Sequence, residues 1–234
     1  MVAADLAAAE AAIERQLGLE LAARDLEVAS FGLRNALYPI GDQLLEVVSP
    51  MRDGTTAGRF LDKRGGDGGY MVIVQVDDLD EARRRIVDTG ARVVYEAAID
   101  GVRGIHLHPA DVGGAILSVD ATDVWEDWPW AGRDWRDHRR LDRVTAVDAV
   151  EIEAADPVAT AARWSAVLGR GPSGEAGITV PLDEGRVDIV PAGERGEGIG
   201  GFVLRGAPGA APVDTVICGC RFRTNPAPPA ATSR

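Results

Sequence analysis

Runs of apolar and polar residues divide much of the chain into three copies of one unit, an extended apolar run followed by an amphipathic helix. The clearest copy, YMVIVQVDDLDEARRRIVDTG, covers residues 70–90, and the others cover 2–18 and 147–169. In each copy 12 or 13 residues separate a helix-capping aspartate from a closing glycine. The capping residues are Asp5, Asp78 and Asp156. This constancy indicates an internal repeat of a strand-helix module.

Further strands are predicted between these units, where short apolar runs lie between glycine, proline and aspartate. They are expected at residues 26–31, 35–39, 43–48, 92–96, 103–108, 115–119, 178–182 and 186–190, with a hairpin over 109–114. The strand before the first helix is nearly missing, because only residues 1–4 precede Asp5.

Residues 198–204 and 215–223 predict the first and last strands of a fourth module whose helix has been deleted. The glycine-rich residues 51–69 predict a connection over the surface or a pocket mouth, with one turn of helix at 57–61. The last residues, 225–234, are rich in proline and alanine and predict disorder.

Residues 120–142 differ in composition and predict a linker between two lobes. They hold four of the five tryptophans, Trp125, Trp128, Trp130 and Trp135. An aromatic cage is one use of such a cluster. The commoner use, which we favour, is to hold a linker against the edge of a core.

Composition narrows the class of protein. A net charge of −12 repels nucleic acid and anionic bilayers, so neither is an expected partner. There is no apolar run of 18 residues, and Asp5 and Glu10 interrupt the start, so the chain is expected to be cytoplasmic. Cys218 and Cys220 would share one face of a predicted strand. A metal site there is open, but two small buried side chains are the favoured interpretation.

Three phrases carry a resemblance to a known family: GDQLLEVVSP (41–50), YMVIVQVDDLDEA (70–82) and HLHPADVGGAILSVD (106–120). With the tandem modules, they resemble the vicinal oxygen chelate superfamily of glyoxalases and bleomycin-resistance proteins. The resemblance implies an α+β fold of tandem βαβββ modules, with half-barrel sheets and the helices outside. The expected domains are a glyoxalase-like domain of two modules (1–120), the Trp-rich linker (121–142), a partial second domain (143–224) and the tail (225–234).

The resemblance also bears on metal binding, since the superfamily's enzymes hold a divalent ion with four side chains, usually His and Glu. The matching positions fall before Met1 and at Glu46, Met71 and Ser118. A thioether and a hydroxyl are poor ligands for hard divalent ions, so no metal or other cofactor is expected. A rearranged site that joins Glu46 to His106 and His108 is the alternative.

Two functions stay open. The first is a metal-independent lyase, isomerase or hydrolase for a small carbonyl compound, with Glu46 as general base and His106, His108 or Tyr70 as proton donor. Its expected catalytic residues are Glu46, His106 and His108, and its expected substrate contacts are Asn35, Tyr70, Met71 and Ser118. The second is a non-catalytic protein that binds or sequesters a small molecule in an apolar pocket.

Two further expectations concern the repeat. Aligning QLLEVVSP with GRVDIVPA places Asp188 opposite Glu46, and each acid is expected either to face the sheet interior or to lie on the surface. The missing fourth helix and the short first strand would leave apolar sheet and a strand edge uncovered. A two-fold homodimer is therefore expected to bury both.

Overall fold

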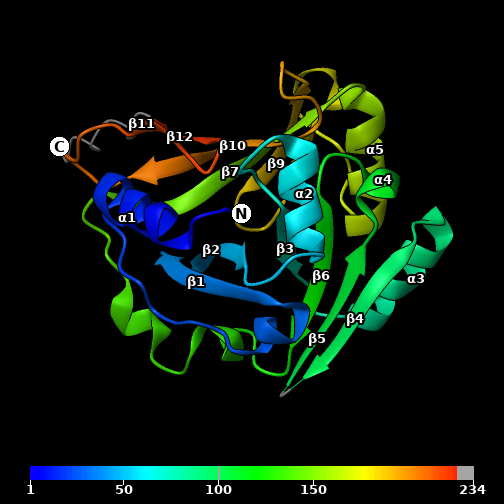
Figure 1. The fold of residues 1–234 in the computed structure, drawn as a ribbon. Helices are drawn as coiled ribbons and strands as arrows, with labels where there is room; N and C mark the ends of the chain where they lie inside the picture. The colour runs from blue at the N-terminus through cyan, green and yellow to red at the C-terminus, as the bar shows by residue number, and fades with distance from the viewer. Residues whose placement is uncertain (100, 226–234) are drawn as a thin grey trace.

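The fold is described from a computed structural model, which describes residues 1–99 and 101–225 (Figure 1). Three sheets form it: a two-stranded sheet, a four-stranded sheet and a six-stranded sheet. The helices lie against the sheets in a mixed α+β arrangement, and the strand-helix modules follow one another along the chain as the sequence predicts. Of the helices in the described ranges, none is long and apolar enough to cross a membrane.

The first module contains α1 (Leu6–Leu17), a 3-10 turn η1 (Glu27–Phe31), β1 (Leu33–Ile40) and β2 (Gln43–Pro50). The Asp5 side chain accepts a hydrogen bond from the Ala8 amide at 3.1 Å and so caps α1, as predicted. In place of a full first strand, Val2 forms single bridges to Val48 and Gly68. This agrees with the expected short first strand.

The strand predicted at 26–31 is wrong, because these residues form the turn η1. The Asp25 side chain accepts a hydrogen bond from the Glu27 amide at 2.9 Å, which favours a turn over an extended strand. Gly32, with φ of 73°, ends the turn. The pairing with β1 is made upstream, where Ala23 bridges Leu37.

The second module follows α2 (Thr56–Arg64), which extends the single turn expected at 57–61. Its elements are β3 (Met71–Gln75), α3 (Leu79–Thr89), β4 (Val93–Ile99), β5 (Val102–Leu107), the single turn α4 (Pro109–Val112) and β6 (Ile116–Thr122). The strand order is β3-β6-β5-β4, with β3 and β6 parallel. The predicted strand-helix-three-strand pattern is confirmed.

The tryptophan segment contains two short 3-10 turns, η2 (Pro129–Ala131) and η3 (Trp135–His138). Trp135 is buried against Leu37 and Ala131, so it holds the segment to the β1–β2 sheet as favoured from the sequence. Trp125 is 46% exposed and takes no part in that core. Trp128 also packs against this cluster, so Trp135 and Trp128 anchor the segment and Trp125 is available for contact.

The third module has β7 (Val144–Ala154), α5 (Pro157–Leu168), a 3-10 turn η4 (Glu175–Gly177), β8 (Thr179–Pro181) and β9 (Arg186–Pro191). The fourth has β10 (Gly198–Gly206), β11 (Asp214–Ile217) and β12 (Cys220–Asn225), with no helix between β10 and β11. Together they form one sheet in the order β11-β12-β10-β7-β9-β8. The strands expected in the third module and the missing fourth helix are confirmed.

The single strand expected at 215–223 is wrong, because β11 and β12 form a hairpin there. Cys218 and Gly219 form its turn with φ of 48° and 68°, left-handed values that an extended strand cannot contain. Cys218 and Cys220 therefore do not lie two apart on one strand. Cys220 is buried in the core, as favoured for a small apolar side chain.

The place of the missing fourth helix is filled from within the chain. Figure 1 shows α1 against the β10–β12 end of the six-stranded sheet, and α1 contacts β11. Ile13 and Leu17 of α1 belong to the same buried cluster as Ile217 and Phe222. The uncovered sheet face that favoured a homodimer is thus covered, and the homodimer itself stays a prediction. The predicted tail beyond Asn225 lies outside the described residues.

Candidate functional site

A cavity of about 1400 Å³ lies between the β1–β2 sheet, the four-stranded sheet, the tryptophan segment and part of the third module. Several large apolar side chains that are exposed in the fold border this cavity: Phe31 (46% exposed), Ile73 (43%), Tyr95 (36%) and Trp125 (46%). Exposed apolar side chains gathered around one cavity are typical of a ligand site.

Glu46 of β2 borders the cavity, while its neighbour Val47 is buried in the core. Its Oε1 accepts a hydrogen bond from Asn35 Nδ2 at 2.6 Å. Asn35 is 1% exposed, and its Oδ1 accepts from the Asp25 amide at 2.9 Å. Since Oδ1 accepts from a backbone N–H, the amide group of Asn35 must turn its NH₂ toward Glu46. The two predicted residues are thus brought together.

The Glu46 carboxyl forms no ion pair with any lysine or arginine of residues 1–99 and 101–225. The side chain is half-buried and borders the cavity. Removal from water raises the pKa of Glu46, and the hydrogen bond from Asn35 and the positive charge of the nearby N-terminal amino group partly oppose this rise. The carboxyl is therefore a stronger base than an exposed glutamate.

Asp120 of β6 is a second buried acid at the cavity, which the sequence analysis missed. It is 1% exposed and accepts a hydrogen bond from the Ser118 hydroxyl. Gly104, its cross-strand partner on β5, leaves room for it, because a Cβ there would lie 2.8 Å from Asp120 Oδ1. Burial raises the pKa of Asp120 to about 6. Two-residue alternation from Ser118 is the signal that could have identified it.

His106, as predicted, borders the cavity. Its ring lies 5.1 Å from the Tyr95 ring, which in turn meets Phe31 edge-on at 5.2 Å. Burial lowers the pKa of His106 to about 4, so the imidazole is neutral near pH 7 and offers one N–H. It can donate a hydrogen bond to a ligand oxygen.

His108 is not among the residues that line the cavity, so the structure does not bring it together with Glu46 and His106. The strand β5 ends at Leu107, and His108 instead caps the turn α4, where its Nδ1 accepts from the Ala110 amide at 3.1 Å. A residue that precedes a proline avoids helical backbone angles. His108 precedes Pro109 and is extended, as a helix N-cap requires. It therefore cannot share a strand face with His106 as expected.

The other predicted contacts lie near the cavity in different ways. Tyr70 borders it, its ring packs edge-on against Phe60 at 5.2 Å, and burial raises the pKa of its hydroxyl. Met71 borders it directly. Ser118 is fully buried, is not among the lining residues, and donates a hydrogen bond to Asp120. Gln75, which was not predicted, borders the cavity and donates to Thr122 Oγ1 at 2.7 Å and to the Trp125 carbonyl at 2.8 Å.

The donor set does not fit the metal site that the resemblance implies. Within the described part of the chain, no three His, Cys, Asp or Glu side chains come together as metal ligands. At two of the family positions stand the thioether of Met71 and the hydroxyl of Ser118, which already donates to Asp120.

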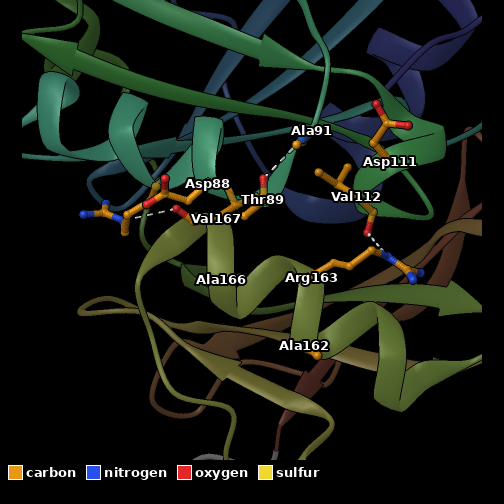
Figure 2. Close-up of a pocket in the computed structure, with 11 residues that line it drawn as sticks. Asp88, Thr89, Ala91, Asp111, Val112, Ala162, Arg163, Ala166 and Val167 are labelled. Carbon is orange, nitrogen blue, oxygen red and sulfur yellow. Dashed lines mark hydrogen bonds between the residues drawn. The ribbon is translucent and has the colours of Figure 1, made fainter.

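A smaller groove of about 700 Å³ lies between α3 and α5 (Figure 2). The two arginines that border it are already engaged. Arg163 donates to the Val112 carbonyl at 3.4 Å, and Arg85 pairs with Glu81 at 2.7 Å. This groove is a packing seam between helices, and it brings together no acid–base pair.

Comparisons with known proteins agree with this architecture. The sequence is 28% identical over 120 residues to the ethylmalonyl-CoA/methylmalonyl-CoA epimerase of Cereibacter sphaeroides, a match that covers 50% of this chain and 89% of that protein. A variant of the Streptomyces coelicolor methylmalonyl-CoA epimerase, solved with 2-nitronate-propionyl-CoA, is 26% identical (TM-score 0.48; 54% of this chain, 93% of that one).

A Staphylococcus aureus protein described as hypothetical shares the fold over almost the whole chain. It has 12% identity and a TM-score of 0.61, and the match covers 90% of both chains. The sequence model of the glyoxalase-like domain matches residues 1–168. The chain therefore belongs to the glyoxalase-like domain family, within the vicinal oxygen chelate superfamily.

Proposed function

We propose that the protein is a proton-transfer isomerase or lyase that acts on a small carbonyl compound bound in the large cavity. The observation that carries this proposal is Glu46, a carboxyl that borders the large cavity, is removed from water and forms no ion pair with a lysine or arginine of the described residues. A general base is most effective when its pKa lies near the working pH, and desolvation moves a carboxyl in that direction.

The proposed step is the removal of a proton from the carbon next to a carbonyl group. The Glu46 carboxylate takes this proton and becomes a carboxylic acid, while the electron pair of the C–H bond moves onto the carbonyl oxygen as an enolate. The neutral imidazole of His106 and the hydroxyl of Tyr70 both border the cavity and can donate a hydrogen bond to that oxygen. Return of the proton gives an isomer, and loss of a leaving group gives a lyase product.

Asn35 positions the base in this scheme. Its backbone contact with Asp25 fixes the amide, so the donated hydrogen bond holds Glu46 in one orientation. The epimerase relatives named above support the same class of reaction, since an epimerase inverts a centre by moving a proton. Their acyl-CoA substrates are not carried over to this chain.

A non-catalytic binding or sequestration protein is the second candidate. The size of the cavity favours it, because about 1400 Å³ is more than a small carbonyl substrate fills. In that case Glu46 would serve as a polar anchor, and the ligand would leave unchanged.

The test is proton exchange in D₂O, followed by NMR for a panel of carbonyl compounds with acidic C–H bonds. We expect loss of one C–H signal with the native protein and a rate lower by about a hundredfold or more with Glu46→Gln. The matched control is Asp188→Asn, which changes the counterpart acid of the repeat and should leave the exchange rate intact. Equal rates for the native protein and Glu46→Gln would remove Glu46 from the mechanism.

A further inference from the structure

The charges around the large cavity point to one class of ligand. Eleven aspartates and glutamates line it against four arginines, and His106 is neutral near pH 7. Each of the four arginines already forms an ion pair: Arg85 with Glu81, Arg136 with Asp42, Arg170 with Asp183, and Arg186 with Asp188. The cavity therefore offers a ligand no free cationic side chain from the described residues.

Most of the lining acids have no such partner. Eight of the eleven, among them Asp25, Glu46 and Asp120, form no ion pair within residues 1–99 and 101–225. Asp120 is 1% exposed, and its neighbour is the Ser118 hydroxyl, which is uncharged. A buried carboxyl at a cavity wall without a positive neighbour leaves a negative potential in the cavity.

Aromatic rings form much of the remaining wall. Phe31 and Tyr95 lie on one side, and Trp125, Trp128 and Trp130 come from the tryptophan segment. Trp128 and Trp130 are tilted at 38° with centroids 5.8 Å apart, so they are not stacked face to face. Ring faces attract cations, and the attraction strengthens where water is excluded.

Polar side chains at the cavity also contact the tryptophan segment. Gln75 of β3 donates to the Trp125 carbonyl, and Arg136 lies 4.2 Å from the centre of the Trp135 ring. The Arg136 guanidinium also donates to the Glu126 carbonyl. These contacts hold the tryptophan segment at the cavity, and they occupy the guanidinium of Arg136.

We propose that the cavity binds an organic cation, a compound with an amine or ammonium group on an apolar or aromatic body. This inference rests on the proposed function, because it names the class of carbonyl compound that the site would take. It also separates this chain from the acyl-CoA epimerases that it resembles. A coenzyme A thioester carries several phosphate charges, and this acidic lining with no free arginine would repel them.

The test is a binding titration measured by tryptophan fluorescence and by calorimetry. Three probes are compared: benzyltrimethylammonium, the anion 3-phenylpropionate, and propionyl-CoA. We expect benzyltrimethylammonium to bind about tenfold or more tightly than either anion. Asp120→Asn should weaken its binding by about tenfold. Trp125→Ala, at an exposed position where folding is not at risk, should weaken it by about threefold. The matched control Asp214→Asn removes a surface charge outside the cavity and should change binding by less than about twofold.

Tighter binding of either anion, no binding of any probe, or an unchanged affinity in both Asp120→Asn and Trp125→Ala would overturn the proposal. These measurements involve no turnover. A failure here combined with Glu46-dependent proton exchange would remove the substrate class and leave the proposed reaction standing.

Discussion

Modules one and two (here the first lobe, up to β6) and modules three and four (the second lobe, from β7) each carry an acid at the same position of the internal repeat. The two acids have different neighbours. In the first lobe, Glu46 accepts a hydrogen bond from Asn35 Nδ2 at 2.6 Å and forms no ion pair with a lysine or arginine of the described residues. In the second, Asp188 accepts from Arg186 Nε at 2.9 Å and from Thr179 Oγ1 at 3.0 Å. The difference traces to the position two residues earlier on the strand, which is Leu44 in one lobe and Arg186 in the other.

The same contrast extends over the two sheets. The six-stranded sheet of the second lobe carries Glu151 paired with Arg223 at 2.8 Å and Asp148 paired with Arg205 at 2.5 Å. Its acids are thus neutralised by nearby arginines. In the first lobe, by contrast, the cavity acids Glu46 and Asp120 have a neutral amide and a hydroxyl as their side-chain hydrogen-bond donors. The repeated modules share a backbone arrangement. The residue beside each acid decides whether its carboxylate is neutralised in an ion pair or is free to react with a ligand.

Leu44→Arg tests this contrast with the largest expected effect, because it gives Glu46 the neighbour that Asp188 has. An arginine on the same strand face would pair with Glu46, lower its pKa and hold its oxygens. We expect proton exchange to fall by about a hundredfold. The measurement is the D₂O exchange rate, with Leu44→Met as the uncharged control. Native exchange in a folded Leu44→Arg protein would contradict the account.

Asp120→Asn tests whether the second acid of the first lobe is truly desolvated. The folded-state pKa of Asp120 is raised to about 6, so its protonated form is favoured on folding. That contribution to stability is complete below the ordinary aspartate pKa and is lost as the pH rises through 6. Asparagine does not titrate, so the variant lacks this loss. As the pH rises from 4 to 7.5, the native protein should therefore lose about 2 kcal/mol of unfolding free energy relative to Asp120→Asn.

Urea unfolding of both proteins at the two pH values measures this difference. A difference that does not change with pH would show that Asp120 is solvated. Ser118→Ala is a useful companion, because it removes the hydroxyl that lowers the Asp120 pKa and should make the pH dependence of the native acid steeper.

Arg186→Leu converts the second lobe toward the first and should have the smallest effect. The Arg186–Asp188 pair is partly exposed, with 38% and 21% of the side chains accessible, so water already screens it. Its loss should cost under about 1 kcal/mol of unfolding free energy by thermal or urea melts. A loss of several kcal/mol would mean that the paired acid supports the fold far more than its exposure implies.

Local patterns were enough to predict most of the fold. The aspartate caps, glycine stops and apolar stripes identified α1, α3 and α5, and short apolar runs identified most strands. Two errors arose where a local hydrogen bond or a left-handed residue overrode the apolar pattern, at Asp25 and at Cys218. The covering of the fourth module by α1 could not be predicted, because it depends on packing between residues nearly 200 positions apart.

The candidate site was less predictable for a physical reason. The family resemblance pointed to Glu46 and strand alternation pointed to His106, and both border the cavity; His108 does not, because β5 ends at Leu107. Asp120 was missed because it stands near a strand end that resembled the start of the linker. Arg186 beside Asp188 can be read from the sequence, but Arg223 beside Glu151 and Arg205 beside Asp148 come from other strands, and a single sequence does not place these.

The most direct test of the central claim is a titration of the Glu46 carboxyl by carbon-13 NMR, with the signal assigned through Glu46→Gln. Desolvation at the cavity predicts a midpoint above the ordinary glutamate pKa of 4.5, and a further rise in Asn35→Ala, which removes the opposing hydrogen bond. A midpoint at or below 4.5 in the native protein would show that Glu46 is hydrated or paired, and would contradict its assignment as the base.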